Sequence, residues 1–174
     1  NNESDWQYQI DNYTKCLRID PDNASAYYNR GNAYSDLKNY NDAIADYSRA
    51  IRIDPDYANA YYNRGIAYYN LEKHEDAIAD YSRAIRIDPE LALAYNNRGN
   101  AYYKLGNNED AIADYTSTIR IDPDNASAYY NRGRVYYTLK NYNDAIDDNS
   151  RAIRIDPDYA NAYYNRGIAK ENAG

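Results

Sequence analysis

Few side chains of this 174-residue chain are suited to catalysis or metal binding. His74 is the only histidine and Cys16 the only cysteine, so a catalytic triad has no convincing nucleophile beside its base. Glu75 and Asp76 follow His74, but one histidine with two carboxylates is a weak signal for a metal site. We expect no catalytic residue, no cofactor and no metal, with His74 in the place of an aromatic residue and Cys16 at a packed position.

Arginines recur at a fixed spacing on what would be the inward face of a helix. The row consists of Arg30, Arg64, Arg98, Arg132 and Arg166. A buried charge needs a partner, and an aspartate follows each of the first four arginines at a constant offset: Asp46, Asp80, Asp114 and Asp148. We predict that each of these four arginines forms an ion pair with the aspartate that follows it, one pair in each full repeat of the sequence repeat defined below. The alternative is that these arginines bind an anion.

A second basic row could in principle follow an anionic polymer. It consists of Lys15, Arg18, Arg49, Arg52, Arg83, Arg86, Arg120, Arg151 and Arg154. Acidic residues such as Asp54 and Asp88 lie beside it, and the net charge of −7 disfavours binding to a phosphate backbone. We therefore expect a solvated charged face and no nucleic-acid partner.

Proline and glycine show that the whole chain is built from an internal repeat. They recur with one common period at Pro21, Pro55, Pro89, Pro123 and Pro157, and at Gly31, Gly65, Gly99, Gly133 and Gly167. This period defines the full repeats 24–57, 58–91, 92–125 and 126–159. We predict a single array over 1–174, in which 1–23 supplies the second helix of a partial repeat and 160–174 a first helix or a capping helix.

Each repeat has the periodicity of two helices. The inward stripe of the first is Ala26, Tyr27, Arg30, Gly31 and Tyr34, and that of the second is Tyr40, Ala43, Ile44, Tyr47, Ala50 and Ile51. The short linker between them forces an antiparallel pair, and Asp54-Pro55 ends the second helix. The fourth repeat departs from this pattern, because Asn149 stands at the core step of the tyrosines.

The pattern Tyr27, Gly31, Tyr34, Ala43, Tyr47, Ala50 and Pro55 closely resembles the tetratricopeptide repeat, and the resemblance covers nearly the whole chain. It implies an all-α, right-handed superhelical solenoid of antiparallel helix pairs. It also implies a concave groove lined mainly by the first helices, which holds other proteins or peptides and carries out no chemistry.

The residues opposite the inward stripe should line that groove. Asparagines and tyrosines dominate the set, which is Tyr28, Asn29, Asn32, Tyr62, Asn63, Tyr69, Asn96, Asn97, Asn100, Tyr103, Tyr130, Asn131, Arg134, Tyr137 and Asn165. An amide can pair with the N–H and C=O of any peptide, and tyrosine adds flat apolar area with a polar tip. The row Asn29, Asn63, Asn97, Asn131 and Asn165 is similar to the asparagine ladder of the O-GlcNAc transferases. The alternative is that asparagine simply suits this helix face.

The partner we expect is an extended peptide or protein segment. Relatives that capture acidic chaperone tails use a basic clamp, whose steps fall here at Tyr28, Leu93 and Asn97; since none is basic, a chaperone C-terminal tail is not expected. The alternatives are a regulatory or targeting arm of a larger protein, and a homo-oligomer formed through the terminal half repeats.

The sequence also favours a cytoplasmic location without a membrane anchor. It contains no apolar run of the roughly 18 residues that a membrane helix needs, and no signal segment opens it. A single cysteine is compatible with a reducing compartment. The chain does not start with Met, so we expect that its natural N-terminus is missing.

Overall fold

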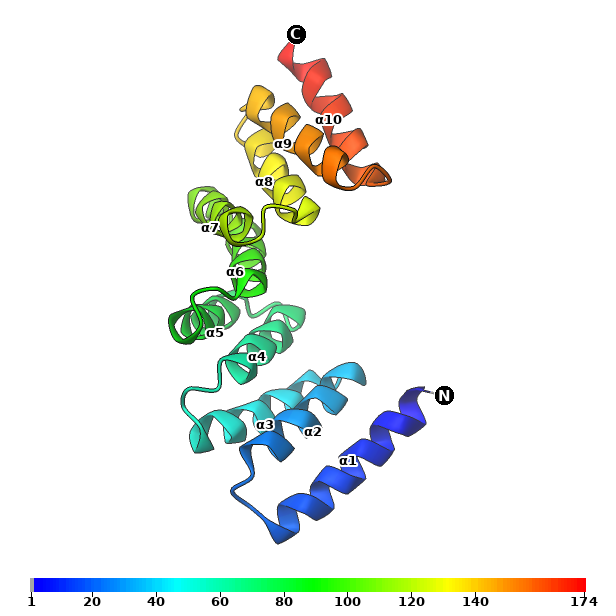
Figure 1. Ribbon diagram of the computed structural model, residues 1–174, viewed down its shortest axis with the longest axis vertical. Coiled ribbons are helices and arrows are strands. Elements are labelled where there is room, and N and C mark those ends of the chain that lie inside the picture. Colours follow the sequence, from blue (N-terminus) through cyan, green and yellow to red (C-terminus); the bar gives the residue numbers. More distant parts are fainter. Residues whose placement is uncertain (1) are drawn as a thin grey trace. The chain divides into compact units, whose positions relative to one another are not determined.

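The computed structural model describes residues 2–174, which fold into ten α-helices without a β-strand (Figure 1). The fold is the predicted all-α solenoid of helix pairs. The helices divide between two compact units, unit 1 (Asn1–Pro89) and unit 2 (Glu90–Gly174).

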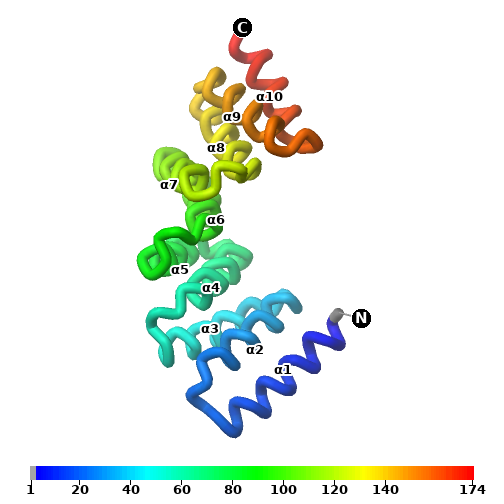
Figure 2. Tube along the Cα trace, viewed as in Figure 1, coloured from blue at the N-terminus to red at the C-terminus, as the bar shows by residue number. Residues whose placement is uncertain are grey.

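Unit 1 holds five helices that the tube in Figure 2 traces in order. They are α1 (Asn2–Ile19), α2 (Ala24–Asp36), α3 (Tyr40–Ile53), α4 (Ala58–Asn70) and α5 (His74–Ile87). Helices α2 and α3 form one antiparallel pair and α4 and α5 the next, while α1 packs on α2 as a second helix does in the full repeats.

Unit 2 repeats this plan with α6 (Ala92–Lys104), α7 (Asn108–Ile121), α8 (Ala126–Thr138), α9 (Tyr142–Ile155) and α10 (Ala160–Ala173). Helix α6 pairs with α7 and α8 with α9, and α10 packs on α9 as the next first helix. The predicted repeat 24–57 thus contains α2 and α3, and 126–159 contains α8 and α9.

Asparagine caps and left-handed turn residues set the ends of several helices. Asn23 Oδ1 accepts the N–H of Ala26 (2.9 Å) at the start of α2, which satisfies one of the free donors of the first turn. At the end of the same helix Lys38 has a φ of 58°, and the next N–H, of Asn39, donates to the carbonyl of Tyr34 (2.8 Å). The chain therefore reverses within three residues, which makes the two helices of a repeat antiparallel.

Alanine, glycine and tyrosine form the interior where larger aliphatic residues would be usual. Ala43 and Ala50 are fully buried, and Tyr47 is only 1% exposed. A Cβ atom on Gly31 would lie 2.8 Å from Tyr47 Cε1, so only glycine leaves room for the ring. The same contact recurs at Gly65 and Gly99. The close glycine–ring contact fixes how near the two helices of a repeat approach each other.

We expect Gly65→Ala to lower the free energy of unfolding by about 1–3 kcal/mol, because the new Cβ would lie 2.7 Å from Tyr81 Cε1 in a packed core. Gly167→Ala is the matched control, since nothing described lies within 4 Å of its Cβ. There alanine should raise stability by up to about 1 kcal/mol through helix propensity. Urea unfolding followed by circular dichroism measures both, and equal midpoints for the two variants would contradict this packing.

Candidate functional site

In each of the four full repeats, the inward face of the first helix carries the predicted Arg–Asp pair. Arg30 donates from Nε to Asp46 Oδ2 and from Nη2 to Asp46 Oδ1, both at 2.7 Å. The pairs Arg64–Asp80, Arg98–Asp114 and Arg132–Asp148 have the same two-bond geometry at 2.7–2.8 Å. The prediction of one pair in each full repeat is confirmed.

These arginines also reach the preceding repeat. Nη1 of Arg30 donates to the Thr14 hydroxyl on α1 (3.0 Å), and Nη1 of Arg64 to the Ser48 hydroxyl on α3 (2.9 Å). The hydrogen-bonded Asp46 carboxylate raises the pKa of Arg30, against the opposing effect of burial. Because Nε, Nη1 and Nη2 of Arg30, Arg64 and Arg132 all have acceptors within the fold, the geometry disfavours the alternative that these three arginines bind a free anion.

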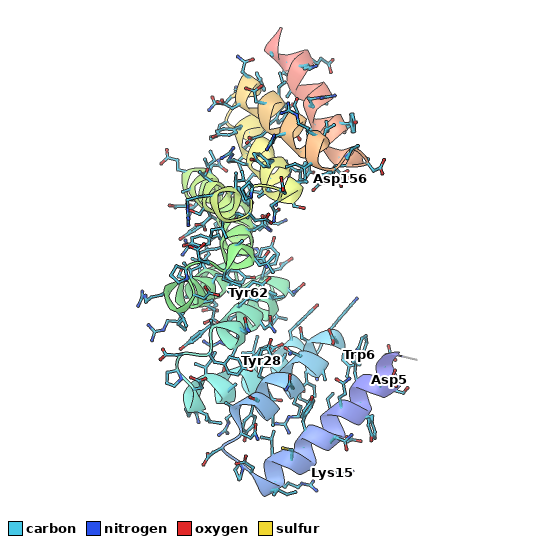
Figure 3. The ribbon with its side chains drawn as sticks, viewed as in Figure 1. Asp5, Trp6, Lys15, Tyr28, Tyr62 and Asp156 are labelled. Carbon is cyan, nitrogen blue, oxygen red and sulfur yellow. The ribbon has the colours of Figure 1, made fainter. Side chains whose placement is uncertain are left out.

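On the opposite face of unit 1, side chains of α2 and α4 form a hydrogen-bonded network. Nδ2 of Asn63 donates to Tyr28 Oη (3.1 Å) and to Asn32 Oδ1 (2.9 Å). The hydroxyl of Tyr47 also donates to Asn32 Oδ1 (2.9 Å). The ring of Tyr28, labelled on α2 in Figure 3, lies 4.9 Å from that of Tyr57. Three predicted site residues, Tyr28, Asn32 and Asn63, are thus brought together.

A surface pocket of about 360 Å³ opens beside this network. Its lining consists of Asn32, Ser35, Asp36, Tyr47, Asn63 and Ile66. Asn32 and Asn63 belong to the set predicted from sequence, whereas Asp36, Ser35 and Ile66 were missed as site residues. All three occupy outward positions of α2 and α4, but residue types that recur from repeat to repeat define the predicted set, and Asp36 does not recur at its step.

In unit 2 the corresponding face of α6 and α8 is covered by rings and a cation. The hydroxyl of Tyr115 donates to Asn100 Oδ1 (2.7 Å), which repeats the bond between Tyr47 and Asn32. The guanidinium carbon of Arg134 lies 4.9 Å from the centre of the Tyr103 ring and 5.7 Å from that of Tyr130. Of the predicted site residues, Asn100, Tyr103, Tyr130 and Arg134 therefore lie on one surface.

The remaining predicted site residues make smaller contacts. Asn131 Nδ2 lies 3.4 Å from Asn96 Oδ1, and Asn96 Nδ2 lies 3.5 Å from Asn97 Oδ1. The rings of Tyr62, Tyr69 and Tyr137 pack on Tyr81, His74 and Tyr142 respectively. All fifteen residues of the predicted set, Asn29 and Asn165 included, are half-buried and not fully exposed.

His74 occupies the place of an aromatic residue, as the sequence predicts. Its ring centre lies 5.0 Å from that of Tyr69, and at the equivalent step of the fourth repeat Tyr142 lies 5.5 Å from Tyr137. Among the described residues, no group of three or more His, Cys, Asp or Glu side chains could hold a metal ion.

Family models assign the repeat. The model described as TPR repeat matches residues 31–72, 68–106 and 99–140, and models described as tetratricopeptide repeat match residues 12–45 and 126–159. The chain belongs to the tetratricopeptide repeat family. No curated protein matches the sequence.

No helix in the described part of this tetratricopeptide chain combines the length and the apolar character needed to cross a membrane.

Solved structures of other tetratricopeptide proteins are similar to the chain. A crystal structure of MamA has 30% sequence identity and a TM-score of 0.86, covering 90% of this chain and 92% of MamA. The structure of YrrB, described as a TPR protein with an unusual peptide-binding site, has 26% identity and a TM-score of 0.83, covering 94% of this chain and 84% of YrrB. The first TPR of Spaghetti (RPAP3), bound to the HSP90 peptide SRMEEVD, has 22% identity and a TM-score of 0.65, covering 67% of this chain and 92% of that one.

The last tetratricopeptide helix, α10, has an uncovered inward face within the described residues. Arg166 contacts the Ser150 hydroxyl (3.5 Å) and has no carboxylate of the kind that pairs with Arg30. A Cβ placed on Gly167 has no described neighbour within 4 Å, whereas one on Gly31, Gly65 or Gly99 would meet a tyrosine ring and one on Gly133 would meet the Asn149 amide. Self-association through the two terminal half repeats, one of the alternatives from the sequence, would use this face at one end, and it stays a prediction.

We expect Arg64→Met to lower the free energy of unfolding by about 3–5 kcal/mol, because it leaves the buried Asp80 carboxylate without its partner. The double variant Arg64→Met with Asp80→Leu should recover most of this loss, since it removes both charges. Arg52→Met is the control: Arg52 is exposed on α3, and its change should stay within about 0.5 kcal/mol. Urea unfolding would contradict the buried pair if the Arg64 and Arg52 variants unfolded at the same concentration.

Proposed function

We propose that this tetratricopeptide protein is an interaction scaffold that holds an extended segment of a partner protein on the outward faces of its first helices. Each unit has such a face of its own, on α2 and α4 in unit 1 and on α6 and α8 in unit 2. The proposal needs no catalytic group, cofactor or metal: the protein acts by binding alone.

The observation that carries this proposal is the pocket of unit 1, which has the amides of Asn32 and Asn63 in its lining. Asn63 donates through Nδ2 to two neighbours, so its Oδ1 stays available to accept a hydrogen bond. Asn32 Oδ1 receives two hydrogen bonds, which leaves its Nδ2 as a donor. One acceptor and one donor next to each other match the N–H and C=O of a peptide backbone.

The comparisons support the binding of peptides in general. YrrB, at 26% identity, is described as having a peptide-binding site, and the RPAP3 domain of the same fold holds a peptide. The alternative, in which asparagine only suits this helix face, gains some support from the bonds of Asn63 to Tyr28 and Asn32. The two roles are compatible, since the internal bonds use the donors of Asn63 and leave its acceptor.

We predict that Asn63→Ala weakens the binding of peptides selected on the parent protein from a random nine-residue display library. The expected loss is about tenfold, which is the value of one hydrogen bond between ligand and protein. The unfolding free energy should also fall by about 1 kcal/mol, because Asn63 donates to Tyr28 and Asn32. Fluorescence anisotropy with the selected peptides and urea unfolding measure the two effects separately.

The matched control is Asn41→Ala, which removes an exposed asparagine from the second helix α3. It should change neither peptide affinity nor stability by a measurable amount. If Asn63→Ala loses stability but binds the selected peptides as tightly as the parent does, the asparagine row is purely internal and the proposed face is wrong.

A further inference from the structure

The pocket of unit 1 has a negatively charged mouth. Asp36 is exposed at the end of α2 and lines the pocket with Ser35. Within the part of the chain that the structure describes, its carboxylate has no hydrogen bond and no ion pair. An acidic residue in the last turn of a helix is unfavourable, since it lies at the negative end of the helix dipole. Neither an interaction partner nor the stability of the helix therefore explains why a negative charge stands at position 36.

The described groups deeper in the pocket include one free donor, Asn32 Nδ2, and acceptors on Asn63 and Tyr47. Asn63 uses its amide nitrogen on Tyr28 and Asn32, and so presents its Oδ1. The Tyr47 hydroxyl gives its proton to Asn32 and can accept through its oxygen. Burial raises the pKa of Tyr47, which keeps this hydroxyl protonated and neutral. The charge of the pocket is then set by Asp36.

The pocket also has an apolar wall and enough room for a long side chain. Ile66 lines it from α4, and its volume is about 360 Å³. Lysine and arginine have aliphatic stems that pack on apolar surface while the charged end reaches polar groups. The aliphatic stem of such a side chain could pack on Ile66 while its cationic group reaches the Asp36 carboxylate.

The equivalent position in unit 2 provides an internal comparison. The framework residues are kept, because Asn100, Tyr115 and Asn131 stand at the steps of Asn32, Tyr47 and Asn63. The residues around them differ in charge and size: Lys104 replaces Asp36, Tyr103 replaces Ser35, and Arg134 replaces Ile66. Arg134 lies over the Tyr103 ring at 4.9 Å. The acceptor-lined pocket is therefore particular to unit 1 and is not a general property of the repeat.

We propose that the pocket between α2 and α4 binds a lysine or arginine side chain of the partner segment, with Asp36 as the residue that selects the positive charge. This inference rests on the proposed function, since the segment must first lie on the face of unit 1. The Asp36 carboxylate takes the cationic group, the Ser35 and Tyr47 hydroxyls accept its further N–H groups, and Ile66 packs on the stem, while Asn32 and Asn63 stay with the peptide backbone.

The test uses the full chain and a random nine-residue peptide display library. Peptides selected on the parent should share a lysine or arginine at one fixed position. For the best of them, four synthetic versions carry lysine, arginine, norleucine or glutamate at that position. Asp36→Asn should weaken the lysine and arginine versions about three- to tenfold and leave the norleucine version unchanged. Asp36→Lys should shift the selection to aspartate or glutamate at the same position.

Asp56→Asn is the matched control, because it removes one negative charge from an exposed turn of unit 1 outside the pocket. It should leave the affinities of all four versions within twofold of the parent. If Asp36→Asn and Asp56→Asn weakened the binding of the lysine and arginine versions equally, the overall charge of −7 would account for the attraction of these peptides. The proposal that Asp36 selects the positive charge in the pocket would then be wrong.

The remaining outcomes separate the two proposals. If peptides are selected and lose affinity with Asn63→Ala but show no preference for lysine or arginine, the inference about Asp36 is wrong and the peptide-binding face stands. A preference that persists in Asp36→Asn overturns the same inference. If no peptide is selected from the library, both the face and the pocket are wrong.

Discussion

The buried Arg–Asp pair sets the orientation of every first helix that has one. The guanidinium of Arg30 reaches the Asp46 carboxylate on its own second helix and the Thr14 hydroxyl on the preceding one. A helix that satisfies both contacts has one rotation about its axis. With 3.6 residues per turn, Tyr28 and Asn32 then lie on the opposite side, two residues before and two after Arg30. An ion pair of this kind often adds little net stability compared with an apolar pair, so its main effect here is orientation.

A core built from tyrosine links the interior to the outward surface. The ring of Tyr47 packs on Gly31, and its hydroxyl must find an acceptor, which is Asn32 Oδ1. The same requirement pairs Tyr115 with Asn100 in unit 2. In the fourth repeat the core step is Asn149, which is fully buried, and its Oδ1 has no partner among the described residues. In that repeat Arg134 stands at the step of Asn32 and Asn100, and its guanidinium packs on the rings of Tyr103 and Tyr130.

Periodic features of the structure could be predicted from the sequence, and local ones could not. The helix pairs and the pairing of Arg30 with Asp46 follow from a constant spacing, because equal spacing in a repeat places equal residues in equal surroundings. The direction of the Asn63 amide depends on Tyr28 and Asn32 from another helix. The pocket at Asp36 depends on side chains from two repeats and on a residue that occurs once at that step. The left-handed φ of Lys38 could not be predicted from the residue type, because lysine does not favour this conformation. Among the four described turns, glycine occupies the equivalent position only at Gly106.

A repeat whose core and inward pairs are fixed leaves its outward positions free to change. Lys104 stands two repeats after Asp36, and Tyr103 two repeats after Ser35. These differences alter neither the Arg–Asp pair nor the glycine–ring contact beneath them. Each repeat contacts only its neighbours, so a change in one outward face has no reason to disturb the others. The same amide framework can then present a carboxylate in unit 1 and two cations in unit 2. Selectivity for a partner would reside in these few outward positions, whereas the recurring asparagines would supply contacts that any peptide backbone can make.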